Sequence, residues 1–315
     1  MGCDSVLGTD IAIDLGTYAI KIYVDGKGIV VNEPAVVAVR AEDEEVLAIG
    51  SEAYAMLGRT SDRVKVIRPL VNGVISNFDL ARYMVDRYIR QLGGTRMIMP
   101  RVVVSIPCQI TEVEKRAVVN AISSAGVGGG TTDRGVISLS GLSISRSLKI
   151  AGLAFDDAII RYTKRTYDLI IGERMAEDCK IAIGGVMQRP EEVVYRVKGR
   201  DANTGLPSYV DLKSTELVEP LLDPASEIVR VLQEMLEKTP PELLGDIYVD
   251  GIVMTGGSAQ LYGLDDFISN KVKMPVHVAD DADICVALGA GKAIQFIDDA
   301  ENKEYGVINP LSAAY

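Results

Sequence analysis

The sequence predicts an α/β protein built from two similar lobes, and three features indicate this fold class. Apolar or alternating stretches, typical of strands, follow one another with stretches of helical spacing along most of the chain. The segments 10–30 and 128–150 share one plan, a glycine-threonine turn followed by a pair of strands. At 315 residues the chain is long enough for two lobes. The repeated plan predicts duplicated lobes that face each other across a cleft.

The first half of the chain predicts a group of strands followed by helices. "DIAIDLG", "YAIKIYV" and "KGIVVNE" are apolar or alternating, Asp25-Gly26 supplies a hairpin turn, and "AVVAV" follows as another strand. A more polar excursion over 42–65 contains an expected helix at "SEAYAMLGR". A helix over 80–92 and a buried strand over 101–107 come next. Thr111 then opens a helix over 111–124 with a capping box.

The second half predicts a return to mixed structure. Strands at "GVISL" and "SISRSLKI" precede helices near 154–167 and 173–184, a polar β-rich segment over about 191–213, and a helix over 224–237. The end predicts strand "GIVMTGG", a helix near 260–270, strand "MPVHVAD" and a helix from Cys285. The expected division is 8–32 and 66–126 with 293–312 for the core of lobe I, 33–65 for its small subdomain, 127–180 and 247–292 for the core of lobe II, and 181–246 for its small subdomain.

Composition limits the classes of function. The net charge of −11 argues against a chain whose main partner is nucleic acid, because phosphate contacts require clustered Lys and Arg. The four cysteines are widely spaced, which favours reduced thiols over a metal knuckle or redox motif. The sequence has no apolar run near the roughly 18 residues of a membrane span, and its start lacks the pattern of a signal peptide. We expect a cytoplasmic protein that is at most associated with a membrane surface.

Two glycine turns are candidates for gripping phosphate. Asp14-Leu15-Gly16-Thr17-Tyr18 sits between two expected strands, where glycine lets backbone amides approach an anion and Asp14 can hold a metal through water. Gly129, Gly130 and Thr131 are candidates for the opposing grip. The alternative for each stretch is an ordinary hairpin turn without a ligand.

Two further stretches carry candidate ligand contacts. Glu177 and Lys180 stand one helical turn apart, so both can point at the same ligand; a solvated ion pair is the alternative. Gly256, Gly257, Ser258 and Ala259 end a strand and open a helix, where unpaired amides favour a phosphate or a ribose edge. A turn without a ligand is again the alternative.

The order and spacing of these four stretches resemble the actin/Hsp70/sugar-kinase ATPase superfamily. More specifically, the chain resembles the MreB family of bacterial actin-like proteins, which determine rod shape. The resemblance covers nearly the whole length and is carried by "IAIDLGT", "GKGIVVNEPAVVAV", "VIRPLVNGVISNFD", "RVVVSIPCQITEVEKRAV", "GGGTTD", "LIIGERMAED", "KGRDANTGLP", "GIVMTGGSAQLYGLD" and "PVHVADDADICVALGAGKA".

This resemblance implies a two-lobed actin-like ATPase fold with duplicated ribonuclease H-like domains, and ATP with Mg2+ as ligands. Asp14, Gly16, Thr17 and Tyr18 would form the first phosphate turn, with Asp14 at the metal, and Gly129, Gly130 and Thr131 the second. Glu177 and Lys180 would border the adenosine, with Gly256, Gly257, Ser258 and Ala259 beneath it; Ser258 stands where the family usually has a third glycine.

The resemblance also implies partners. Subunits would assemble head to tail into filaments, and the helix over 111–124 would pair two filaments. Met97, Ile98 and Met99 would dip into the inner face of the cell membrane, and the filaments would direct the cell-wall elongation machinery. A mobile loop tip is the alternative for Met97, Ile98 and Met99.

One departure from the family precedes Gly128. Where the family has a strand, a helix and another strand, this sequence passes directly from Ala125-Gly126 to Val127-Gly128, so about thirty residues, the size of one strand–helix–strand step, are absent. The Glu that positions the attacking water in the family and the second carboxylate near the metal are lost with them, so no catalytic residue is expected. The chain is then either a filament scaffold or degenerate copy that does not hydrolyse ATP, or a sequence from which a segment was omitted.

Overall fold

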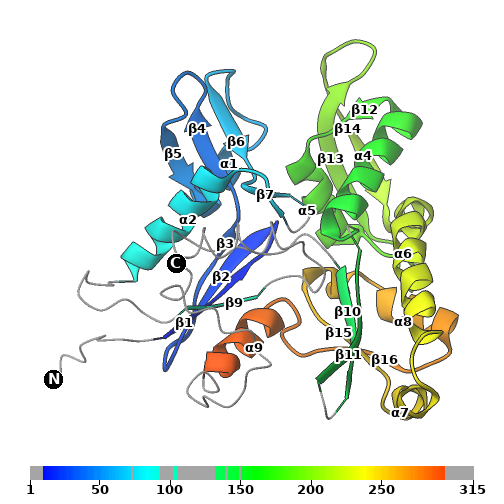
Figure 1. Ribbon diagram of the computed structural model, residues 1–315. Helices are drawn as coiled ribbons and strands as arrows, with labels where there is room; N and C mark the ends of the chain where they lie inside the picture. Colours follow the sequence, from blue (N-terminus) through cyan, green and yellow to red (C-terminus); the bar gives the residue numbers. More distant parts are fainter. Residues whose placement is uncertain are drawn as a thin grey trace. The chain divides into compact units, whose positions relative to one another are not determined.

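The structure, a computed structural model, describes residues 10–71, 74–92, 102–105, 132–138, 141–148 and 150–294. The chain divides into two compact units: Met1–Gly130 with Val286–Tyr315 forms unit 1, and Thr131–Cys285 forms unit 2. Both units combine helices and strands, as the α/β prediction requires (Figure 1). The finer division into four subdomains stays a prediction.

The main sheet of unit 1 has four strands in the order β3-β2-β1-β9. These strands are β1 (Ile11–Leu15), β2 (Ala19–Val24), β3 (Gly28–Pro34) and β9 (Val102–Val104). β1 pairs antiparallel with β2 and parallel with β9, so it is central and its apolar residues are buried on both faces. The predicted turn at Asp25-Gly26 is confirmed, with Gly26 at φ 74° in the left-handed region.

The rest of the described part of unit 1 has two smaller sheets, β5-β4-β6 and β7-β8, with helices. β4 pairs antiparallel with both β5 and β6. The elements are β4 (Val37–Arg40), β5 (Val46–Ile49), β6 (Val64–Ile67), β7 (Leu70–Val71), β8 (Val74–Ile75), α1 (Gly50–Met56), α2 (Phe78–Gln91) and α9 (Cys285–Ala293). Asn77 caps α2, because its side chain accepts a hydrogen bond from the Leu80 amide. The sequence predicts only a helix between 42 and 65, so β5 and the start of β6 are additions to the prediction.

Unit 2 contains three separate sheets among its described residues. β10 pairs antiparallel with β11, β12-β13-β14 form a second sheet, and β15 pairs parallel with β16. The strands are β10 (Thr132–Ser138), β11 (Gly141–Leu148), β12 (Leu169–Ile170), β13 (Val194–Asp201), β14 (Pro207–Lys213), β15 (Ile252–Met254) and β16 (Val276–Val278). The predicted β-rich segment near 191–213 is thus the β13–β14 hairpin.

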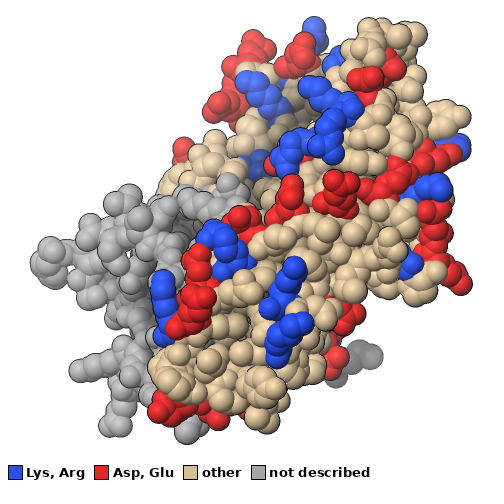
Figure 2. All heavy atoms as spheres, turned by 90° about the vertical axis from the view of Figure 1, so that its right-hand side faces the viewer, with Lys and Arg blue, Asp and Glu red and all other residues tan. Residues whose placement is uncertain are grey.

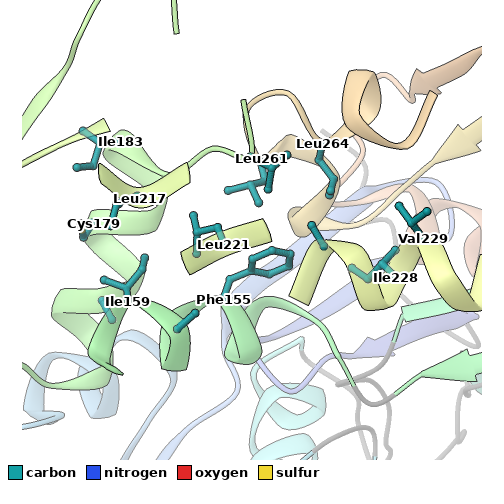
Figure 3. Packing of buried hydrophobic residues seen from close by; sticks show 14 of the residues in the cluster. Phe155, Ile159, Cys179, Ile183, Leu217, Leu221, Ile228, Val229, Leu261 and Leu264 are labelled. Atoms are coloured by element: carbon teal, nitrogen blue, oxygen red, sulfur yellow. The ribbon is translucent and has the colours of Figure 1, made fainter. Parts of the chain in front are cut away.

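The helices of unit 2 enclose its largest core. They are α4 (Gly152–Tyr167), α5 (Glu173–Ile183), α6 (Ser214–Leu236), α7 (Pro241–Asp250), the short 3-10 helix η1 (Gly257–Gln260) and α8 (Leu264–Val272). Side chains from α4, α5 and α6 point into one cluster, where Phe155 of α4 meets Leu221 of α6 (Figure 3). Burying a side chain of this size contributes about 1.5–3 kcal/mol. This core fixes α4 against α5, where two candidate site residues lie.

α6 begins ten residues before the helix predicted over 224–237. Pro220 and Pro224 both lie inside it. An internal proline removes a backbone hydrogen bond and costs about 3 kcal/mol. In the fold, Leu217 and Leu221 are fully buried in the core, which offsets that cost and lets the helix start at Ser214.

The surface carries charges of both signs. On the face drawn in Figure 2, Lys and Arg lie among Asp and Glu. Several of these charges are paired: Arg230 contacts Glu227 and Glu234 on α6, and Arg196 makes two hydrogen bonds to Asp211 across the β13–β14 hairpin. Such exposed pairs contribute little to stability.

Candidate functional site

The turn between β1 and β2 is closed by a backbone hydrogen bond from its glycine. The Gly16 amide donates to the Ala19 carbonyl oxygen over 2.7 Å. A Cβ at Gly16 would lie 2.8 Å from that same oxygen, so only glycine fits without moving backbone. Thr17, at the tip, is 1% exposed. The shape of the turn therefore explains why position 16 is a glycine.

Asp14 lies beside Ser105, a residue that the sequence did not single out. Because β1 and β9 are parallel and Ile13 pairs with Val104, their carboxyl ends meet at one edge of the sheet. The Ser105 hydroxyl donates to the Asp14 carboxylate over 2.7 Å. Burial raises the pKa of Asp14 above its ordinary value, while the hydrogen bond from Ser105 and the charge of Lys21 partly offset that rise. The sequence signal that could have identified Ser105 is its place as a small polar residue directly after a buried strand.

Arg68, which lies between β6 and β7, supports the same turn. Its guanidinium lies 5.1 Å from the centre of the Tyr18 ring, and Nη1 donates to the Thr17 carbonyl oxygen over 3.4 Å. A cation over an aromatic face is attracted to it. Arg68 thus holds the turn residues Thr17 and Tyr18 in place, and sequence spacing could not have shown this contact.

Lys180 is placed by a partner that the sequence did not reveal. Its ammonium lies 2.8 Å from the carboxylate of Asp156 and donates to the Gly152 carbonyl oxygen over 3.3 Å. Asp156 is 3% exposed, so the pair lies in the interior of unit 2, where α4 begins. Glu177 is half-buried one turn earlier on α5. The Lys180 ammonium therefore contacts a buried carboxylate on another helix, and the Lys180 side chain is only 15% exposed.

The stretch after β15 forms a tight turn, as predicted. Gly256 has φ 88°, and its amide donates to the Ala282 carbonyl oxygen over 2.5 Å. The helix opened here is the short η1, in which the Ala259 amide donates back to Gly256 and Ala259 is buried. Cβ atoms at Gly256 and Gly257 would meet nothing within 4 Å. The backbone conformation, rather than crowding, thus calls for glycine at position 256.

The remaining candidates lie outside the described residues. These are Gly129, Gly130 and Thr131 of the second glycine turn, Met97, Ile98 and Met99, and the helix over 111–124. The described candidates form two groups: Asp14 to Tyr18 belong to unit 1, and Glu177, Lys180 and 256–259 belong to unit 2. The residues of each group therefore lie within a single unit.

A metal ion fits Asp14 only in part. Among the residues that the structure describes, no three His, Cys, Asp or Glu side chains gather as ligands. Mg2+ in nucleotide sites is held by one or two carboxylates together with water and phosphate oxygens. Asp14 supplies one such carboxylate, and Ser105 fixes its orientation.

In the described part of the chain, no helix is both long enough and apolar enough to cross a membrane.

Comparison with solved structures shows an actin-like ATPase fold. Two solved structures of MreB5 from Spiroplasma citri superpose on the chain: the one bound to ADP has a TM-score of 0.86 at 30% identity and covers 95% of this chain and 98% of that one. The one bound to AMPPNP has a TM-score of 0.83 at 31% identity, covering 95% and 99%. The MamK double helical filament, at 16% identity and a TM-score of 0.78, covers 91% of this chain and 98% of that one and shows the fold alone.

The chain belongs to the MreB/Mbl protein family, whose sequence profile matches residues 8–127 and 125–302. Cell shape-determining protein Mbl of Bacillus cereus is 39% identical over 321 residues, covering 92% of this chain and 96% of the relative. Cell shape-determining protein MreB of Escherichia coli K12 is 38% identical over 330 residues, covering 93% and 95%. The expected family and fold are confirmed.

The comparisons also agree with the predicted gap. The family profile matches in two stretches that meet at residues 125–127, directly before Gly128. The alignment with Mbl spans 321 positions but covers 92% of the 315 residues, so about thirty of its positions have no counterpart in this chain. This is the length of one strand–helix–strand step.

Proposed function

We propose that this chain is an ATP-binding subunit of a cell-shape cytoskeleton that assembles into filaments at the membrane and hydrolyses ATP poorly. The observation that carries the proposal is the first phosphate turn, in which Gly16 closes the turn and Asp14 is oriented by Ser105. The nucleotide-bound MreB5 structures support ATP as the ligand.

Each described residue has a physical role in this proposal. Because the Gly16 amide closes the turn on Ala19, the backbone amides that follow Gly16 would donate hydrogen bonds to phosphate oxygens. Asp14 would hold Mg2+, and the cation would favour the ionised form of Asp14 and so reverse the effect of burial on its pKa. When bound, Mg2+ would neutralise charge on the phosphates.

On unit 2, Lys180 and Glu177 border the adenosine. Asp156 fixes the Lys180 ammonium at the start of α4, so its position is set before any ligand arrives. Such preorganisation lowers the cost of binding because less side-chain freedom is lost. The turn at 256–259 lies under the nucleoside in this proposal.

Hydrolysis is the weak step because the water-positioning Glu and the second carboxylate belong to the segment missing before Gly128. Losing a positioned catalytic group typically costs roughly 10²–10⁴-fold in rate. Binding depends on backbone amides and Asp14, which remain. The scaffold alternative, in which filaments form without any turnover, is the limiting case of the same loss.

Filaments and membrane contact complete the proposal. Subunits associate head to tail, since a heterologous contact that does not close generates a filament, and 111–124 pairs two filaments. Residues 97–99 give each subunit weak membrane affinity, which many copies multiply. The filaments lie on the inner face of the cell membrane, where they direct the cell-wall elongation machinery.

The substitution Asp14→Ala tests the proposed role of the first glycine turn in binding ATP. Equilibrium binding of a fluorescent ATP analogue with Mg2+ should be detectable for the unaltered chain and lost for the variant. Ser105→Ala should weaken the binding less, because it removes only the orienting hydrogen bond. Equal binding by all three chains would contradict the assignment of the first turn.

A further inference from the structure

The loop that follows α5 and the segment that follows η1 lie side by side in unit 2. Gly185 and Tyr262 form an isolated parallel β-bridge, and the Val186 amide donates to the Tyr262 carbonyl oxygen over 3.0 Å. Ile183, the last residue of α5, and Leu261, which follows η1, are both buried in the core of unit 2 (Figure 3). The two elements that carry the candidate nucleoside contacts are therefore joined through this bridge.

Two glycines allow this close approach. A Cβ at Gly185 would lie 3.2 Å from side-chain and backbone atoms of Tyr262, which is tighter than ordinary van der Waals contact. A Cβ at Gly263 would lie 2.8 Å from the side chain of Met187, and Gly263 has φ 72° in the left-handed region. The loop and the segment are therefore in direct contact at two places.

Arg189 fastens the bridge from the loop side. Its guanidinium carbon lies 4.4 Å from the centre of the Tyr262 ring, and Nη2 donates to the Gly184 carbonyl oxygen over 3.1 Å. The Gly184 amide donates to the Lys180 carbonyl oxygen over 2.9 Å and so ends α5. A cation is attracted both to an aromatic face and to the carbonyl groups at a helix C-terminus. Arg189 therefore ties the end of α5 to the segment after η1.

The guanidinium of Arg189 depends on these two contacts. Its Nε is buried and finds no hydrogen-bond acceptor among the described residues. Burying a donor without an acceptor costs free energy, which the other contacts of the side chain must offset. Removing either the guanidinium or the Tyr262 ring should therefore loosen the bridge.

We propose that Arg189 is a positioning residue for the nucleoside half of ATP, an inference that rests on the proposed function. Arg189 and Tyr262 keep the end of α5 beside the segment after η1. The nucleoside then meets two walls that are already in place, one with Glu177 and Lys180 and the other with residues 256–259. Binding to elements that are already in place loses less conformational freedom. The phosphates, which are assigned to the first glycine turn in unit 1, do not depend on Arg189.

Equilibrium binding of a fluorescent ATP analogue with Mg2+ tests this role, at a temperature well below the melting temperature of every variant. Arg189→Met keeps most of the apolar stem and should weaken binding at least about fivefold, the scale of a partly buried contact between a cation and a ring. Tyr262→Leu should weaken it similarly, whereas Tyr262→Phe keeps the ring and should bind like the unaltered chain. A lower melting temperature with unchanged affinity in Arg189→Met would mean a purely structural role and would overturn the proposal.

Two further comparisons show whether the effect belongs to this contact. Arg196→Met is the matched control, because the Arg196 guanidinium lies 4.5 Å from the centre of the Tyr209 ring on the exposed β13–β14 hairpin. Its ATP affinity should not change, and a loss equal to that of Arg189→Met would contradict the site. The double variant Arg189→Met with Tyr262→Leu should bind no more weakly than the weaker single variant, and fully additive losses would mean that the two residues act separately.

Competition by tripolyphosphate separates the nucleoside half from the phosphate half. Tripolyphosphate with Mg2+ should displace the analogue from Arg189→Met with the same affinity as from the unaltered chain, because it has no nucleoside. Equal weakening of ATP and tripolyphosphate would overturn the assignment to the nucleoside. No binding of the analogue by the unaltered chain would overturn the proposed function and this inference with it. Binding that Arg189→Met leaves unchanged would overturn the role of Arg189 alone.

Discussion

Removing the Lys180 charge should destabilise unit 2 strongly, because its partner is buried. In the pair, the side chain of Lys180 is 15% exposed and that of Asp156 is 4% exposed, and the charged atoms lie 2.8 Å apart. Lys180→Met keeps most of the apolar stem but leaves the Asp156 carboxylate without its cation. Breaking a buried pair from one side typically costs about 3–5 kcal/mol.

Urea unfolding followed by circular dichroism measures this cost as a shift of the unit 2 transition. Arg230→Met is the matched control: Arg230 also contacts carboxylates, but on the exposed face of α6, so the change should be far smaller. The double variant Lys180→Met with Asp156→Leu should recover most of the loss, because an apolar pair no longer buries an unpaired charge. A loss below about 1 kcal/mol for Lys180→Met, comparable to an exposed pair, would refute the buried pair as a determinant of stability.

Three other substitutions test the turn, the carboxylate and the membrane contact. Gly16→Ala should lower the melting temperature of unit 1, because the new Cβ would lie 2.8 Å from a backbone oxygen. The control Gly245→Ala, whose Cβ would meet nothing within 4 Å, should slightly raise the melting temperature of unit 2. Equal shifts for both variants would contradict the crowding at Gly16. Burial raises the folded-state pKa of Asp14, so the carboxyl stabilises the fold below its unfolded value near 3.8 and loses that contribution as pH rises through the higher folded pKa. Asp14→Asn should therefore raise the melting temperature without ligand more at pH 7 than at pH 3, and the reverse order would refute the sign. Replacing residues 97–99 by Ser should reduce co-sedimentation of filaments with liposomes, and unchanged co-sedimentation would remove these residues as the membrane contact.

Local chemistry was enough to predict a glycine turn between β1 and β2. Gly16 follows a run of apolar residues and precedes another, and the structure shows why no larger residue fits there. The hairpin at Asp25-Gly26 was also predicted from local sequence, and Gly26 has the positive φ that such a turn requires. Such features depend on a few neighbouring residues.

Contacts between distant residues could not be predicted in this way. Ser105 meets Asp14 only because β9 pairs in parallel with β1, ninety-one residues away in sequence. Asp156 meets Lys180 only because α4 packs on α5 around a shared core. The sequence predicted a helix from residue 224, but α6 starts at Ser214, because burial of Leu217 and Leu221 outweighs the cost of its two prolines. In each case tertiary packing decided the outcome.

Binding without efficient turnover is the central claim, and a single set of kinetic measurements tests it most directly. ATP binding and multiple-turnover phosphate release would be measured on the unaltered chain with Mg2+, beside an intact relative such as Mbl of Bacillus cereus. The account predicts that ATP binds, that Asp14→Ala abolishes the binding, and that phosphate release is at least about 10²-fold slower than in the relative. Phosphate release at the rate of the relative would contradict it, because the segment missing before Gly128 would then not be needed for hydrolysis.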